Sequence, residues 1–206
     1  MTNNRGRIFR IGGVAGCGKT TLTAVIDKLV RESDMPFASI DTRLLQCELA
    51  GVRSEKMYRK IPEEKRRELF PLITQRIIEI ADQQPNKIWY FERHLCSMNE
   101  EGDIIARGIT DDHGERMVGL AIILACENQI ETWRKMDKGI RKDRHLLTPA
   151  QILIEQATEI ELALESSRYW NFPVHLFFNQ QGCCLRQASE IFSFLKRVFK
   201  KFGEQY

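Results

Sequence analysis

Glycines, a lysine and a threonine near the start of the chain have the spacing of a phosphate-binding loop. They lie in the stretch IGGVAGCGKTT, residues 11–21, which fits the pattern G-x-x-x-x-G-K-[ST]. Glycines let backbone N–H groups point at phosphate oxygens, the lysine reaches the β- and γ-phosphates, and the threonine hydroxyl ligates Mg²⁺. The stretch therefore predicts ATP and Mg²⁺ as cofactors. The residues expected to bind the nucleotide are Gly13, Gly16, Cys17, Gly18, Lys19, Thr20 and Thr21.

The flanking sequence supplies the elements that must position such a loop. Residues 7–11 are typical of a strand, and residues 22–30 carry apolar side chains at helical spacing. A helix that begins near Lys19 directs the positive end of its dipole toward the bound anion. Strand, glycine-rich loop and helix thus follow one another in the required order.

Short apolar segments alternate with helical patterns along the rest of the chain. Further strands are expected at residues 36–41, 87–92, 120–126 and 173–179, and helices at 44–49, 62–83, 149–170 and 186–202. Pro71 is expected to kink or divide the second of these helices. The alternation predicts an α/β P-loop NTPase fold over residues 1–206, as one domain: a five-stranded parallel sheet with helices on both faces and a short lid. Ligands of such sheets bind beyond the carboxyl ends of the strands.

Two strand ends carry polar side chains that could face the loop. The third strand ends in Glu92, which is either an acid near Mg²⁺ or its water, or a general base toward a hydroxyl acceptor. The structural alternative is a carboxylate paired with Arg93. Asp41 and Thr42 follow the second strand, and they either line an acceptor pocket or cap the next helix.

A cationic segment follows the fourth strand. Residues 132–148 are rich in lysine and arginine, with aspartates between them. Phosphoryl transfer needs cations that neutralise the transferred group, and a mobile basic segment can close over phosphates and exclude water. We therefore expect a lid here, with Arg134, Arg141 and Arg144 as catalytic candidates. A solvated, salt-bridged helix is the structural alternative.

Composition narrows the range of partners. The net charge of +3 over 206 residues is too small to indicate nucleic acid, and no apolar run is long enough to span a membrane. The start, MTNNRGRIF, lacks the apolar core of a signal peptide, and the cysteines lack paired zinc-ligand spacing. These features predict a cytoplasmic protein with reduced thiols, and they leave the oligomeric state open. With the phosphate-binding loop, the partners expected are small-molecule nucleotide substrates.

Together these motifs resemble the archaeal-type adenylate kinases, a branch of the nucleoside monophosphate kinases. The segment YRKIPEEKRRELFPLITQRI is similar to that family's RKLP segment and following helix, and IWYFERH stands where the family has a strand ending in Asp-x-His. WRKMDKGIRKDR stands where the family has its arginine-rich lid, and the closing strand ends in Asn179.

The resemblance implies transfer of the ATP γ-phosphate to a nucleoside monophosphate. Lys19 would stabilise the transferred group, and the loop at Asn179 would hold the adenine of ATP. Arg59, which by its residue type alone is either a phosphate-binding cation or a surface charge, would bind the monophosphate. The acceptor-binding insert would cover residues 42–85, and the substrate-binding candidates are Asp41, Thr42, Arg59, Arg93 and His94.

Two departures keep other functions open. Glu92 stands where that family has Asp, and Glu-Arg at this place is also similar to the deoxynucleoside kinases, in which the Glu is the general base. A longer polar segment, residues 95–119, replaces the family's Pro/Gly-rich loop. The leading hypothesis is a kinase for a nucleoside monophosphate, AMP first. The others are a kinase for a nucleoside or another small alcohol, and a nucleotide-dependent switch or partner-binding protein.

Overall fold

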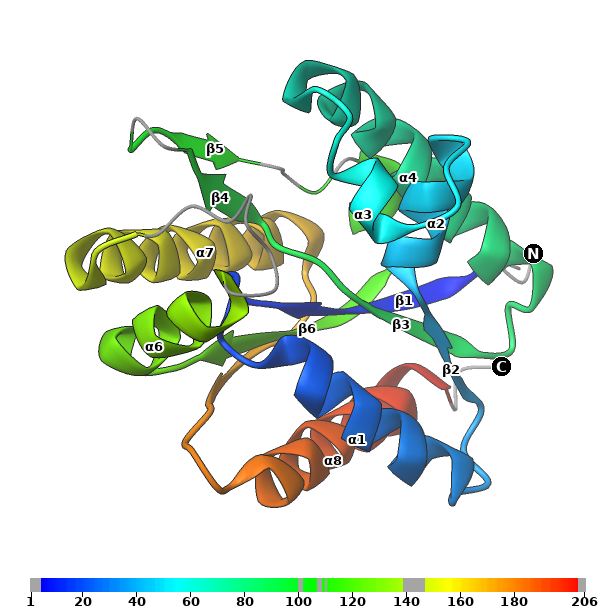
Figure 1. The fold of residues 1–206 in the computed structure, drawn as a ribbon. Coiled ribbons are helices and arrows are strands. Elements are labelled where there is room, and N and C mark those ends of the chain that lie inside the picture. Colours follow the sequence, from blue (N-terminus) through cyan, green and yellow to red (C-terminus); the bar gives the residue numbers. More distant parts are fainter. Residues whose placement is uncertain (1–4, 100–101, 107–108, 110, 139–146, 204–206) are drawn as a thin grey trace.

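A sheet of five parallel strands forms the centre of the molecule (Figure 1). The computed structural model describes residues 5–99, 102–106, 109, 111–138 and 147–203. The strands lie in the order β2-β3-β1-β6-β7, so the strand before the glycine loop is in the middle. Their bounds are Arg7–Gly12 (β1), Phe37–Ile40 (β2), Ile88–Glu92 (β3), Met117–Leu124 (β6) and Val174–Phe178 (β7).

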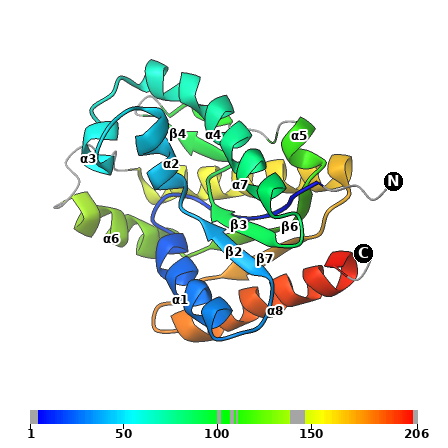
Figure 2. The ribbon, with the colours of Figure 1, turned by 90° about the vertical axis from the view of Figure 1, so that its right-hand side faces the viewer.

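Helices cover both faces of the sheet. Figure 2 shows α1 and α8 on one face and α4 and α7 on the other. The helices are α1 (Lys19–Arg31), α2 (Thr42–Leu49), α3 (Glu55–Tyr58), α4 (Glu63–Gln83), α5 (Asp111–Gly114), α6 (Glu127–Lys138), α7 (Pro149–Trp170) and α8 (Cys184–Gly203). The predicted α/β P-loop fold, with a five-stranded parallel sheet between two helical layers, is therefore confirmed.

The side chains of β1 alternate between two apolar cores. Phe9 packs edge-to-face on Phe194 of α8, with ring centroids 5.6 Å apart, whereas Ile8 belongs to the opposite cluster with Ile77 of α4. Because both faces are buried, Ile8, Phe9 and Ile11 are apolar, and the buried Arg10 between them donates from Nε to the carbonyl oxygen of Arg93 at 3.1 Å. This burial fixes the end of β1, and with it the start of the glycine loop.

Two predicted boundaries differ from the structure. Pro71 does not divide α4, which runs unbroken from Glu63 to Gln83 because its apolar face is buried against the sheet on the C-terminal side of the proline. The fourth parallel strand lies at Met117–Leu124 and not at residues 120–126. It ends early because the next backbone unit, Ala125, bonds in both directions to the side-chain amide of Gln156, at 3.0 Å each.

Several short elements are not evident from the sequence. An antiparallel hairpin, β4 (Cys96–Met98) with β5 (Ile104–Ala106), follows β3 within the polar segment of residues 95–119. Helices α3 and α5 are one turn each, and α6 begins five residues before the predicted lid. In the described part of the chain, no helix has the length and apolar character needed to cross a membrane.

Candidate active site

The glycine loop joins the end of β1 to the start of α1. Gly13, Gly16 and Gly18 have φ angles of 125°, 90° and 93°, which residues with a side chain rarely adopt. A Cβ atom on Gly18 would lie 2.2 Å from Nδ2 of Asn179, so only glycine fits there. The helix α1 begins with no side-chain cap and no acidic residue in its first turn. Its uncapped N–H groups and its dipole fit the phosphates of a nucleotide.

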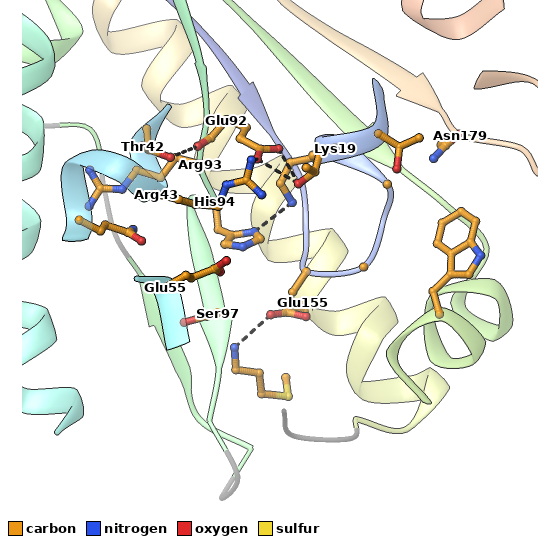
Figure 3. A pocket seen from close by; sticks show the side chains of 18 of the residues that line it. Lys19, Thr42, Arg43, Glu55, Glu92, Arg93, His94, Ser97, Glu155 and Asn179 are labelled. Carbon is orange, nitrogen blue, oxygen red and sulfur yellow. Dashed lines mark hydrogen bonds and ion pairs between the residues drawn. The ribbon is translucent and has the colours of Figure 1, made fainter. Parts of the chain in front are cut away.

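Lys19, the first residue of α1, is buried and folds back across the loop. Its Nζ donates to the carbonyl oxygens of Gly13 and Val14, at 2.6 and 2.8 Å. Nδ1 of His94 lies 3.2 Å from this Nζ and 2.6 Å from the Gly13 oxygen (Figure 3). The ammonium and the imidazole therefore meet at the base of the loop. Lys19 has to release these loop carbonyls before it can bind a phosphate.

Thr20 and Glu92, the two predicted Mg²⁺ ligands, are in contact. The Oγ1 atom of Thr20 lies 3.0 and 3.1 Å from the two carboxylate oxygens. Strand pairing places Glu92 beside Ile11, at the end of β1, so the sheet itself brings the carboxylate to the loop. The described residues contain no group of three or more His, Cys, Asp or Glu suited to a metal ion. Mg²⁺ sites usually combine one or two protein ligands with phosphate oxygens and water, so Thr20 and Glu92 would be part of such a site.

Glu92 also borders the second half of the cavity. A guanidinium nitrogen of Arg43 lies 3.9 Å from its Oε1 atom. The cavity has a volume of about 960 Å³ and extends from the glycine loop to helices α2, α3 and α4. Its lining beyond Glu92 comes from those helices and the β4–β5 hairpin: Thr42, Arg43, Gln46, Glu55, Tyr58, Arg59, Glu63, Arg66, Phe70, Ser97, Met98, Asn99 and Ile105.

Two cations line the end of the cavity formed by α2, α3 and α4, the acceptor end that the sequence predicts. Arg59 lies in the lining and forms an ion pair with Glu55, one turn earlier. Arg66, on α4, also lines the cavity, and its Nε atom is buried without a hydrogen-bond partner among the described residues. Sequence reasoning did not single out Arg66, because it lies in a run of charged residues typical of a solvated helix face.

The other predicted substrate-binding residues differ in their surroundings. Asp41 caps α2: its Oδ1 atom accepts from the backbone N–H groups of Arg43 and Leu44, and the residue is outside the cavity lining. Thr42 lines the cavity and donates its hydroxyl to the Glu92 carbonyl oxygen at 3.0 Å. Arg93 lies in the lining too, but its guanidinium faces α4, where it donates to the hydroxyl of Thr74 at 3.2 Å. Thr42, Arg93 and His94 are thus together at the carboxyl end of the sheet, with Glu92.

A buried carboxylate of α7 fastens the loop to the segment after β3. Glu159 has no exposed surface and accepts hydrogen bonds from the backbone N–H groups of Gly13, Leu95 and Cys96, at 2.7 to 2.9 Å. Sequence reasoning missed this residue. The available signal is that polar residues interrupt the apolar stripe of α7, where the core-facing positions should be hydrophobic.

Arg134 is buried between α6 and α7 and does not project into open space. A terminal guanidinium nitrogen lies 2.7 Å from Oε2 of Glu155, and its Nε donates to the Ala15 carbonyl of the glycine loop, also at 2.7 Å. In this arrangement Arg134 braces the loop, and its catalytic role stays a prediction. Arg141 and Arg144 lie outside the described residues, as does the lid from residue 139 to 146.

Asn179 and Cys17 connect the glycine loop to the end of β7. The side-chain amide of Asn179, at the end of β7, donates to the Cys17 carbonyl at 2.7 Å. The Cys17 thiol is fully buried, 3.8 Å from Nζ of Lys19. Burial raises the pKa of this thiol, although Lys19 acts in the opposite direction. Thr21, in contrast, is exposed and lines the cavity.

Comparison with known proteins shows the fold and leaves the family open. No protein-family model matches the sequence, and no curated protein matches it. The structure is similar to shikimate kinase from Acinetobacter baumannii in complex with shikimate, with a TM-score of 0.54, 13% identity and 93% of each chain covered. It is also similar to the crystal structure of APE1195, with a TM-score of 0.53 and 15% identity, covering 95% of this chain and 97% of that one. Over almost its whole length, the chain thus has the fold of a P-loop kinase.

Proposed function

We propose that the protein is an ATP-dependent phosphotransferase that moves the γ-phosphate of Mg-ATP to a small-molecule acceptor, with a nucleoside monophosphate, AMP first, as that acceptor. One observation carries the proposal: a single cavity joins the glycine loop to an end lined by Arg59 and Arg66, with Glu92 between them. Phosphoryl transfer needs the donor and the acceptor in line within one site that excludes water. In this cavity the glycine loop would hold the donor, and the opposite end would hold the acceptor.

Different residues along this cavity would bind the donor, Mg²⁺ and the acceptor. The loop N–H groups and the start of α1 bind the donor phosphates, and Lys19 exchanges its loop carbonyls for phosphate oxygens. Thr20 and Glu92 would hold Mg²⁺, which neutralises charge on the phosphates. Arg59 and Arg66 would bind the anionic group of the acceptor, so that its attacking oxygen faces the γ-phosphate.

A hydroxyl acceptor is the second candidate, because Glu92 faces both the loop and the acceptor end. A carboxylate in this position can take the proton of an attacking alcohol, whereas a monophosphate is already ionised and needs no base. One structural neighbour is a kinase described in complex with shikimate. A nucleoside or another small alcohol therefore belongs in the same test as AMP.

The test is the rate of ADP formation from Mg-ATP with each nucleoside monophosphate, each nucleoside and shikimate in turn. We expect strong stimulation by a monophosphate, and loss of turnover in Lys19→Ala. Arg66→Gln should raise KM for a monophosphate by roughly 10- to 150-fold, because a hydrogen bond to a charged group is lost. No stimulation by any acceptor would contradict the proposal and favour a nucleotide-dependent switch.

Glu92→Gln separates the two acceptor classes. It should lower kcat by about 10²- to 10⁴-fold for a hydroxyl acceptor, and by less for a monophosphate. Glu48→Gln, an exposed carboxylate on α2, is the matched control and should leave kcat unchanged.

A further inference from the structure

An indole stands at the end of the cavity away from the acceptor residues. Trp133 of α6 lines the cavity and is half-buried, packing against the core cluster beneath the glycine loop. Its Cζ3 atom lies 3.8 Å from the position that a Cβ atom of Gly18 would take. Part of the indole therefore remains open to the cavity, directly beside the loop.

The helix that carries Trp133 is firmly seated. Ile130 and Arg134, one turn apart on a neighbouring face of α6, lie beside the glycine loop: a Cβ atom on Gly16 would come within 3.5 Å of Ile130 and 3.2 Å of Arg134. Ile130 is fully buried, and Arg134 is held by Glu155 and by a loop carbonyl. The indole is thus fixed relative to the phosphate-binding backbone, which lowers the entropy cost of using it as a binding surface.

The direction of transfer decides which part of a nucleotide reaches this end. Glu92 and the acceptor residues lie on one side of Lys19, and Asn179 lies on the other (Figure 3). The γ-phosphate has to face the acceptor, so the sugar and base of the donor extend toward Asn179 and Trp133. The side-chain amide of Asn179 is already committed to the Cys17 carbonyl, so it is not free to bond the base through that donor.

We infer that Trp133 is the stacking surface for the base of the donor nucleotide, an inference that rests on the proposed donor site. Tyr58 and Phe70, the other large aromatic side chains of the lining, belong to the acceptor end. The indole and residues 179–182 line this end of the cavity, toward which the base has to extend. Stacking on an aromatic ring accepts any base, because every base has a π-face.

Equilibrium binding of ADP and of inorganic tripolyphosphate tests the inference without any acceptor. Trp133→Leu should weaken ADP binding by about 5- to 150-fold, the value of one base–aromatic stack, and should leave tripolyphosphate binding unchanged. Trp133→Phe should keep most of the ADP affinity. Trp170→Phe, at the far end of α7, is the matched control and should bind both ligands as the unmodified protein does.

Tryptophan fluorescence gives a second readout that does not need the leucine variant to fold. ADP should quench the emission of the unmodified protein and of Trp170→Phe, and this quenching should disappear in Trp133→Phe. Equal losses for ADP and tripolyphosphate in Trp133→Leu, or quenching that persists in Trp133→Phe, would overturn the inference. A protein that passes these tests and phosphorylates no acceptor would refute the proposed function alone.

Discussion

Replacing Glu159 by glutamine is the most informative change of a single atom. The carboxylate has no exposed surface, and three backbone N–H groups point at it. Oε1 accepts from Gly13 and Leu95, and Oε2 accepts from Leu95 and Cys96. Glutamine keeps only one acceptor oxygen. Whichever way the amide turns, the N–H group of either Gly13 or Cys96 then faces an NH₂ group.

The expected cost follows from these contacts. A buried donor left without an acceptor costs about 1–3 kcal/mol, and the new NH₂ group is a second such donor. The total is about 2–6 kcal/mol, which lowers Tm by roughly 4–24 °C in a chain of this size. If the orphaned donor is that of Gly13, the glycine loop also loses its anchor, and the affinity for Mg-ADP should fall.

Urea unfolding and ADP titration measure both effects. Glu161→Gln, an exposed carboxylate on the same helix, is the control and should change stability by less than about 0.5 kcal/mol. Burying a charge is itself costly, so an unchanged or raised stability of Glu159→Gln would show that desolvation outweighs the three hydrogen bonds. That result would refute the role assigned to this carboxylate.

Three further predictions concern the loop and the core. Gly18→Ala should abolish ADP binding, as calorimetry would show. The control is Gly51→Ala, which is also at positive φ, but where an added Cβ atom would have no described atom within 4 Å. Equal effects of the two substitutions on ADP binding would refute the steric argument. Burial, assisted by two nearby arginines, holds the pKa of His113 well below its usual range. The unfolded chain then binds a proton that the native state excludes, so stability should fall below about pH 6.5, by up to about 1.4 kcal/mol per pH unit. In urea titrations His113→Phe should flatten this slope, and an unchanged slope would contradict the assignment. A thiol reagent should label exposed Cys126 at once and Cys17 only on unfolding, as mass spectrometry would show; rapid labelling of folded Cys17 would contradict its burial.

The glycine loop and the sheet are predictable because their determinants are local. The loop motif spans eight residues, and its backbone geometry depends on glycines that the sequence displays directly. Apolar runs mark the parallel strands, and the order of strands and helices then limits the topology. The meeting of Thr20 and Glu92 follows from the same logic, since Glu92 ends β3 and Thr20 lies in the first turn of α1, which follows β1 at the same edge of the sheet.

Strand boundaries and short elements are not predicted from the sequence, because contacts with side chains distant in the sequence determine them. The fourth parallel strand stops at Leu124 since an amide of α7 takes the hydrogen bonds of the next residue. The β4–β5 hairpin lies in a polar segment without a long apolar alternation, so periodicity gives no signal for it. Its place on the cavity wall depends on how that segment leaves β3.

Arg134 shows why charge alone is a poor guide to a lid. In the sequence it belongs to a basic segment and appears equivalent to Arg141 and Arg144. In the structure its guanidinium forms an ion pair with Glu155 of α7 and a hydrogen bond to a carbonyl of the glycine loop. A buried arginine in this position loses its solvation but gains charge-assisted hydrogen bonds, so its side chain is held in one place. If Arg134 exchanged either partner for a phosphate oxygen, occupancy of the donor site would be linked to the seating of α6.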